Sequence, residues 1–334
     1  MDWSKGFTAE YKLFKVDPST WDDLEEFPLI NGAISRDMKD SLLESASIEI
    51  NDYIGETWVR VYLIARQGGD IVREPIFTGL TSSPSRSLNG KRQTFDVDCY
   101  SVLKPAADKL VPLGFYIPQG QPGAPAVAAL LKSAGVRVTY QNIVGALDAP
   151  LVAEKGESVL TMAQAILAGI GCHLIISGHG EVTIAPFDGI VKATYGSLEN
   201  DSVEPKITDT DDWYKCPNVL RVTAGSQTAT VFDDDVESDL STVRRGREIW
   251  AEESVTLSDA TALSAYTRAR LKELQEYTRT ISYDRRFAPD LKPGDVIRMS
   301  YPEHGIDSIF RISSQNIELT HGARTSEEAY ELKY

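Results

Sequence analysis

The sequence predicts a mainly β protein with α+β insertions, and three observations support this prediction. The first third of the chain contains at least five short segments that alternate polar and apolar residues between turn-forming residues. Segments of the same kind return in the last third. Between them lies a stretch with helical periodicity that is followed by a hairpin pattern. A chain of 334 residues also exceeds what one hydrophobic core usually serves, so several domains are expected.

The first domain, residues 1–108, is expected to be a barrel or sandwich of short strands. Period-two alternation predicts strands, because successive side chains of a strand point to opposite faces. A Gly-rich loop at residues 66–70 and a segment at residues 85–90 that ends in Asn-Gly predict turns. For the acidic segment at residues 21–27 we predict neither a helix nor a strand. The predicted strands are residues 10–16, 43–50, 57–65, 75–80 and 91–100.

The middle region, residues 109–210, is expected to be a small α+β domain. Residues 110–125 hold many Pro and Gly residues and are predicted to be a linker. A short helix over residues 126–134 is expected to end at Gly135. Residues 157–170 give the strongest helix prediction, with Ser158 as N-cap. Its apolar stripe consists of Val159, Met162, Ala163, Ile166 and Leu167. A hairpin follows, with strands at residues 173–176 and 181–186.

The last domain, residues 211–334, is expected to be a second β domain with one helix. An acidic, turn-rich stretch at residues 200–213 marks the boundary before it. Ser258 is expected to start a helix over residues 259–276, and residues 233–239 form an acidic loop. Residues 328–334 are expected to add a final edge strand. The other predicted strands are residues 218–224, 228–232, 278–283, 296–301 and 308–319.

The charge and the composition exclude several classes of protein. The net charge of −15 disfavours nucleic-acid binding, because affinity for phosphates comes from clustered Lys and Arg. Arginines do cluster at residues 244–247 and 285–286, but no aromatic stacking pattern accompanies them. The sequence contains neither a signal-peptide pattern nor an apolar run long enough for a membrane span, so synthesis in the host cytoplasm without stable membrane insertion is expected. Cys99, Cys172 and Cys216 are expected to be buried and reduced.

No segment carries a catalytic motif, and we predict no catalytic, cofactor-binding or metal-binding residues. The four histidines, His173, His179, His304 and His321, lack HExxH or H-x-H spacing. Residues 177–180 and 224–226 superficially resemble nucleophile turns but do not read G-x-S-x-G, so both are interpreted as ordinary turns.

Two groups of acidic residues are candidate Ca²⁺ ligands. They are Asp209, Asp211 and Asp212, and the acidic loop at residues 233–239. Both lack the EF-hand spacing, so solvated loops are the preferred interpretation. A glycosidase pair of carboxylates stays open, because such a pair meets only in three dimensions.

The order of the segments carries further information. A strand, a Gly-rich turn and Pro-Ile-Phe-Thr-Gly at residues 75–79 precede a strand at residues 95–100, and residues 156–186 give a helix plus hairpin. In the last domain, a helix over residues 262–274 precedes a Thr-Ile-Ser strand. The pattern L-x-x-G-D-V at residues 291–296 and Ile-Phe-Arg-Ile at residues 309–312 follow. This arrangement resembles the hub proteins of phage tails and baseplates, including the late control protein D group.

The resemblance implies a non-enzymatic homotrimer whose first and last domains are both tube-like β-barrels. Three copies would form a pseudo-sixfold ring that joins the tail tube to the tip and lines the DNA channel, with the middle modules toward the tip. An acidic lumen would keep DNA from adhering during ejection. The implied location is the virion tail. The implied partners are the tail tube protein, distal tail or baseplate proteins, a tip, spike or fibre protein and a tape measure protein, while DNA only passes through.

Two alternatives stay open at the level of sequence. One is a tail-associated cell-wall hydrolase, although the chain ends at Tyr334 without a lysozyme or peptidase extension. The other is a carbohydrate- or receptor-binding module of the tail tip. Trp213, Tyr214 and Trp58 are its candidate aromatic contacts, although aromatics in strands usually belong to the core.

Overall fold

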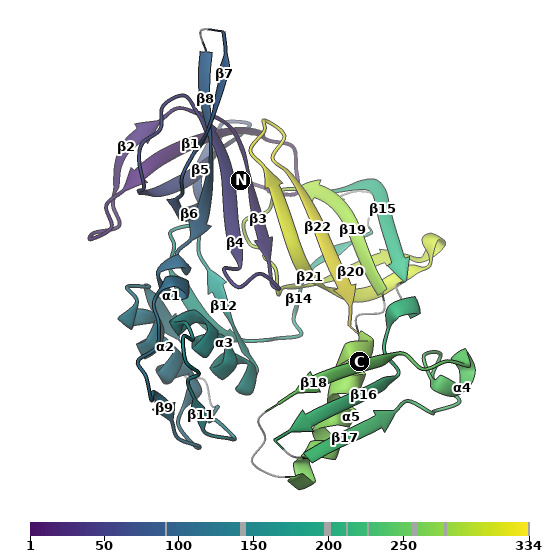
Figure 1. Cartoon of the computed structure of the whole chain (residues 1–334). Helices are drawn as coiled ribbons and strands as arrows, with labels where there is room; N and C mark the ends of the chain where they lie inside the picture. Colours follow the sequence, from purple (N-terminus) through teal and green to yellow (C-terminus); the bar gives the residue numbers. More distant parts are fainter. Residues whose placement is uncertain are drawn as a thin grey trace.

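The computed structural model contains two β units that lie side by side, with an α/β module and a smaller inserted module beneath them (Figure 1). The structure describes residues 1–90, 92–140, 145–196, 202–211, 213–225, 227–255, 260–276 and 279–332. Strands dominate the elements, which confirms the predicted mainly β fold class with α+β insertions. Within the described residues, no helix is long and apolar enough to cross a membrane.

The first β unit is a curved antiparallel sheet in the order β3-β4-β8-β6-β5-β1-β2, with β7 paired to β8. All five predicted strands are present, and their inward side chains, such as Leu13, Val61 and Phe77, are fully buried. The acidic segment at residues 21–27, for which no helix or strand was expected, contains edge strand β2. The expected turn at residues 85–90 is wrong for residues 85–89, because they form strand β7, which pairs with β8. The bounds are β1 (Thr8–Val16), β2 (Asp23–Phe27), β3 (Leu29–Asp37), β4 (Glu44–Ile50), β5 (Trp58–Gln67), β6 (Asp70–Thr81), β7 (Ser85–Asn89) and β8 (Arg92–Ser101).

The second β unit has the order β15-β19-β22-β21-β20-β14. The last strand, β22, was expected at an edge of the sheet. This prediction is wrong, because β22 lies inside the sheet and pairs with β19 on one side and β21 on the other. The stretch at residues 200–213, expected to be turn-rich, contains strand β15, which pairs with β19. The bounds are β14 (Val191–Tyr195), β15 (Val203–Asp211), β19 (Arg279–Arg286), β20 (Val296–Tyr301), the 3₁₀ turn η2 (Pro302–His304), β21 (Ile306–Glu318) and β22 (Arg324–Glu331).

Strands β3 and β21 join the two units in one antiparallel ladder that runs from Asp37↔Ser314 to Ala33↔Glu318. Among the described strands, no ladder joins β2 to β3 or β15 to β14, so neither unit closes into a hydrogen-bonded barrel, which corrects the expectation of two β-barrels. The first unit curls back instead, because the Ala9 amide on β1 donates to the carbonyl of His321 in the β21–β22 turn at 3.1 Å. The result is one 14-stranded sheet that is continuous across both units.

The α/β module packs helices α2 and α3 against a small mixed sheet in the order β10-β13-β12. The predicted N-cap is confirmed, since Ser158 Oγ accepts a hydrogen bond from the Thr161 amide at 3.0 Å. The predicted linker is wrong, because its residues form β9, with Ile117 buried, and the start of α2. The bounds are α1 (Lys104–Asp108), β9 (Tyr116–Ile117), α2 (Gly123–Ser133), β10 (Val138–Tyr140), β11 (Leu151–Val152), α3 (Val159–Gly169), β12 (Cys172–Ile176) and β13 (Val182–Pro186).

The inserted module is a separate three-stranded sheet, β17-β16-β18, with helix α5 over one face. The predicted helix start Ser258 lies outside the described residues. The domain limits at 108 and 210 stay a prediction, although strand pairing places β14 and β15 with the last β unit. The bounds are η1 (Trp213–Lys215), β16 (Val219–Ala224), β17 (Gln227–Phe232), α4 (Thr242–Arg245), β18 (Trp250–Ser254) and α5 (Ala260–Glu276).

Candidate assembly surface and domain junction

A buried polar network connects the two β units beside the β3–β21 ladder. Arg36 on β3 donates to the carbonyl of Ile76 at 2.6 Å and to Gln315 Oε1 on β21 at 3.3 Å. The Gln315 amide donates in turn to Glu327 Oε1 at 2.5 Å and to the carbonyl of Leu291 at 2.9 Å. Because buried polar groups cost free energy unless they are hydrogen-bonded, this chain of contacts fixes how the two units meet.

Glu327 is the anion at the centre of this network. Arg285 donates to both carboxylate oxygens of Glu327, at 2.8 and 2.5 Å, and the hydroxyl of Tyr283 donates at 2.5 Å. Burial by itself would lower the pKa of Arg285, but the charge of Glu327 and its hydrogen bonds outweigh burial and raise this pKa. The guanidinium therefore stays charged inside the protein.

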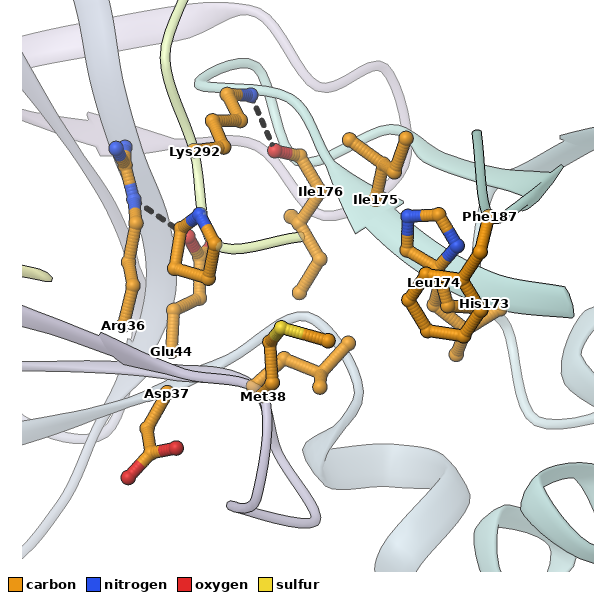
Figure 2. Close-up of a pocket in the computed structure, with 12 residues that line it drawn as sticks. Arg36, Asp37, Met38, Glu44, His173, Leu174, Ile175, Ile176, Phe187 and Lys292 are labelled. Carbon is orange, nitrogen blue, oxygen red and sulfur yellow. Dashed lines mark hydrogen bonds and ion pairs between the residues drawn. The ribbon is translucent and has the colours of Figure 1, made fainter. Parts of the chain in front are cut away.

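A cavity of about 90 Å³ lies where the two β units and the α/β module meet (Figure 2). Glu44 is buried beside it, with Arg36 Nε 3.5 Å from one carboxylate oxygen, and burial raises the pKa of Glu44 to about 7. Lys292 Nζ donates to the carbonyl of Ile176 at 2.6 Å and so ties the second β unit to the α/β module. The apolar walls include Met38, Leu43, Leu174 and Phe187.

The turn between β12 and β13 docks the α/β module on the first β unit. Thr78 Oγ1 on β6 donates to the carbonyl of Gly178 at 2.6 Å. A Cβ atom on Gly178 would lie 1.7 Å from the carbonyl oxygen of Pro75, so only glycine allows this approach. The interpretation of residues 177–180 as a turn is confirmed, and the glycine permits a close contact between modules.

One face of the 14-stranded sheet is exposed and polar across the join between the units. Ser47 on β4 lies opposite Asp98 on β8, and Asn316 on β21 lies opposite Ser35 on β3. The alternate residues point into the cores, as the period of a strand requires. We call this surface the polar sheet face. Its side chains, exposed or half-buried, are Asn31, Ser35, Ser45, Ser47, Glu49, Asp96, Asp98, Asp284, Arg286, Asn316, Glu318, Arg324, Ser326 and Glu328.

The four histidines lie at separate places in the described structure. The ring of His173 stacks on Phe187 with centroids 4.2 Å apart, and burial lowers its pKa. His179 lies in the docking turn, and His321 contacts the backbone of β1. His304 is exposed beside the neighbouring carboxylate of Glu303. The structure therefore does not bring the histidines together into one constellation.

The acidic residues that are candidate Ca²⁺ ligands by sequence have other contacts in the structure. Asp209 accepts two hydrogen bonds from Arg279, at 3.1 and 2.8 Å, while Asp212 lies outside the described residues. Asp233 accepts hydrogen bonds from Ser238 and Gln275. Over the described ranges, no group of three or more potential metal ligands is found. The three cysteines, Cys99, Cys172 and Cys216, are buried thiols, as predicted.

The aromatic candidates divide into a packed and an exposed group. Trp58 packs on Trp21 with centroids 5.1 Å apart and joins the core of the α/β module. Trp213 and Tyr214 are exposed on the inserted module. The expectation that no aromatic stacking accompanies the arginines of residues 244–247 is wrong, because Arg247 stacks on Tyr214 at 4.0 Å. Sequence inspection missed this contact because the two residues lie far apart along the chain.

No family model and no curated protein sequence matches this chain. Several solved structures match it. A tail protein from Neisseria meningitidis MC58 matches with a TM-score of 0.69 at 15% identity, over 98% of this chain and 97% of that chain. The 43 kDa tail protein of prophage MuSo2 from Shewanella oneidensis matches with a TM-score of 0.67 at 12% identity, over 98% of both chains.

The chain has the phage tail protein fold. A prophage tail protein from Listeria monocytogenes EGD-e shares it, with a TM-score of 0.59 at 12% identity over 98% of this chain and 95% of that chain. The phage tail protein fold extends over nearly the whole chain in all three cases, so both β units and both modules belong to it. The resemblance inferred from the order of sequence segments is thereby confirmed at the level of fold.

Proposed function

We propose that this protein is the structural hub of a phage or phage-like tail tip or baseplate. In this proposal it forms a homotrimeric, pseudo-sixfold ring that joins the tail tube to the tip or spike and lines the DNA channel. The phage tail protein fold supports a structural location in a tail. Proteins with the same fold are named as tail proteins in three different bacteria or their prophages.

The observation that carries the proposal is the continuity of the polar sheet face across the two β units. The β3–β21 ladder places the units in one sheet, so each chain offers two adjacent β units to a ring. Three chains would then present six units to a sixfold tail tube. The buried network of Arg36, Gln315 and Glu327 holds the two units in a fixed relation, as such a ring requires.

The chemistry of the polar sheet face suits a channel for DNA. It carries six carboxylates, Glu49, Asp96, Asp98, Asp284, Glu318 and Glu328, against the two arginines Arg286 and Arg324. Its remaining side chains are small and uncharged. A surface of this composition offers few cations to the phosphates and repels the duplex, so DNA passes without adhering.

In the proposed assembly the partners are the tail tube protein above the ring and distal tail or baseplate proteins around it. A tip, spike or fibre protein lies below, and a tape measure protein in the channel. The protein is synthesised in the host cytoplasm and is located in the virion tail. Its part in this assembly is structural, and we propose no catalytic residues, cofactor or metal.

Cryo-electron microscopy of the native particle, or of the subunit co-expressed with its neighbouring tail genes, tests the proposal. We expect a threefold ring in which both β units face the tube and Asp96 and Asp98 line the lumen. A monomer outside the tube axis with a carboxylate-lined cleft would contradict it and favour a cell-wall hydrolase. Location at the periphery with sugar bound to exposed aromatics would favour a receptor-binding module.

A further inference from the structure

Helix α4 lies at one end of the small sheet of the inserted module (Figure 1). Two exposed aromatic rings of η1 and two half-buried arginines, one in α4 and one just after it, lie together on this module. Trp213 and Tyr214 are 47% and 62% exposed, and their rings meet at 66° with centroids 6.2 Å apart. The guanidinium carbon of Arg247 lies 4.0 Å from the Tyr214 centroid, and that of Arg245 lies 5.6 Å from the Trp213 centroid. We call these four residues the aromatic–arginine patch.

Backbone hydrogen bonds hold the aromatic–arginine patch in place. Arg245 donates to the carbonyls of Cys216, Trp213 and Tyr214 at 2.8, 2.7 and 2.8 Å. Arg247 donates to the carbonyl of Tyr214 at 2.6 Å. The arginines therefore clamp the segment that presents the rings, and a ligand does not have to order it. Preorganisation of this kind lowers the entropic cost of binding.

The charges of the patch are not balanced within the described structure. Two neighbouring arginines of the module, Arg221 and Arg244, pair with Glu252 at 2.9 Å and Asp239 at 2.7 Å. For Arg245 and Arg247, the described residues provide no carboxylate within ion-pair distance. Burial and the charge of Arg247 both lower the pKa of Arg245. Among the described residues, these two cations therefore have no carboxylate partner, on a chain whose net charge is −15.

A second aromatic pair extends this end of the module. Phe232 and Trp250 are exposed and meet edge to face at 5.8 Å, and Arg221 stacks over Trp250 at 4.7 Å. Both rings flank Val219 in the strand register, so they lie at the sheet end that follows η1. Helix α5 covers the other face of this sheet. Exposed rings rimmed by charges are typical of protein interaction sites.

We propose that the aromatic–arginine patch binds an acidic polypeptide segment of a neighbouring tail protein. A carboxylate of the segment would contact the guanidinium of Arg247, because arginine suits contact with carboxylates. The positive charge of Arg245, whose guanidinium donates to three backbone carbonyls, would add to the attraction. An apolar or aromatic side chain between them would pack on Trp213 and Tyr214. The tail location of the partner rests on the proposed function, whereas the acidic chemistry of the partner rests on the patch alone.

The geometry favours an acidic peptide over two other ligands. A sugar needs a flat platform, and the two rings stand at 66° to each other between cations. DNA extends well beyond the patch and would meet the acidic remainder of the chain, which repels phosphates. A short acidic segment fits within the cationic area and avoids this repulsion.

Fluorescence anisotropy with labelled peptides tests the proposal on the full chain. The probe is the peptide Asp-Glu-Phe-Glu-Asp-Pro-Glu-Asp, and its neutral counterpart has Asn and Gln in place of the acidic residues. We expect the acidic peptide to bind, with affinity that falls as salt rises. Tyr214→Ala and Arg247→Glu should each weaken binding about tenfold or more, as anchor residues of an interface do. Arg247→Lys, which keeps the charge, should weaken it less than Arg247→Glu.

Matched controls are Tyr116→Ala, an exposed ring on β9, and Arg298→Glu, an exposed arginine on β20. Both should bind the peptide as the unaltered chain does, and thermal unfolding verifies that every variant is folded. The proposal is overturned if no peptide binds or if the patch variants bind normally. It is also overturned if an oligo-dT strand or a chito-oligosaccharide binds the patch more tightly. If a ring forms in particles without peptide binding, only this inference fails; if the peptide binds but no ring exists, only the hub proposal fails.

Discussion

Arg285 on β19 and Glu327 on β22 form an ion pair from which water is excluded. Their closest atoms, Nη2 and Oε1, are 2.5 Å apart, and the side chains are 1% and 0% exposed. Glu327 also accepts a hydrogen bond from Gln315, whose side chain contacts Arg36 of the first β unit. The pair therefore stabilises the second unit and also orients the residue that joins the two units.

Glu327→Gln is expected to destabilise the protein by about 3–5 kcal/mol, because it leaves the guanidinium of Arg285 buried without a counter-charge. Chemical denaturation followed by fluorescence measures the loss. The control is Glu328→Gln, a neighbouring carboxylate on the polar sheet face, which should change stability by less than about 0.5 kcal/mol. A double variant, Arg285→Met with Glu327→Gln, should recover part of the lost stability, because it removes the unpaired charge and keeps a hydrogen-bond acceptor for the hydroxyl of Tyr283. Equal stability of Glu327→Gln and Glu328→Gln would contradict this account.

Gly178→Ala is expected to disturb the docking of the α/β module. Its Cβ atom would lie 1.7 Å from the carbonyl oxygen of Pro75, so the turn or strand β6 has to shift. We expect a loss of about 1–3 kcal/mol, as for other overpacked sites. Faster hydrogen exchange in β6 and in the β12–β13 hairpin should accompany it. Gly69→Ala is the control, since no atom lies within 4 Å of a Cβ there, and it should leave exchange unchanged.

The pH dependence of stability should reveal the raised pKa of Glu44. Burial raises the pKa of Glu44 from 4.5 to about 7, so the folded state holds this proton at pH values where the unfolded state has released it. The contribution of protonated Glu44 to the free energy of unfolding is complete below pH 4.5 and is lost as the pH rises through about 7. The shift corresponds to a loss on the order of 3 kcal/mol between the two limits.

Glu44→Gln removes this titration. We expect the difference in denaturation midpoint between pH 5 and pH 8.5 to be smaller in Glu44→Gln than in the unaltered chain. Glu49→Gln, on the same strand but on the polar sheet face, should keep the full difference. If Glu44→Gln and the unaltered chain show parallel pH profiles, Glu44 is ionised in the folded protein at neutral pH and the interpretation is wrong.

Sequence patterns predicted those elements that have one apolar face. Helix α3 and strand β5 are examples, because Val159, Ile166 and Val61 repeat at the period of their element and are fully buried. Strands β2 and β15 were not assigned, because edge strands carry charged residues along an exposed backbone and resemble loops. The position of β22 was also missed, since a strand pattern does not reveal which neighbours it will have.

The candidate surfaces depend on contacts between distant parts of the chain. Tyr214 and Arg247 are 33 residues apart, and Arg36 and Gln315 are 279 apart. A local sequence pattern cannot reveal contacts over such distances. The stacking of Tyr214 on Arg247 and the hydrogen bond between the two β units are therefore visible only in the folded structure. The turn at Gly178 was recognisable as a turn, but its contact with β6 was not.

The polar sheet face gives the last prediction, which concerns assembled particles. Glu49→Lys, Asp96→Lys and Asp98→Lys together replace three carboxylates of the proposed lumen by cations, which would attract the phosphates of passing DNA. We expect ejection triggered in vitro, followed by a DNA-binding dye, to become slower or incomplete. High salt should restore it, because the attraction is screened.

The matched control is Asp234→Lys, Asp235→Lys and Glu237→Lys, which changes the net charge by the same amount on the exposed acidic loop of the inserted module. This control should eject DNA normally if the loop lies outside the channel. Both triple variants replace exposed or half-buried side chains, so the purified subunits should unfold close to the temperature of the unaltered chain. Normal ejection from particles that carry the Glu49, Asp96 and Asp98 substitutions would show that this face does not line the path of the DNA.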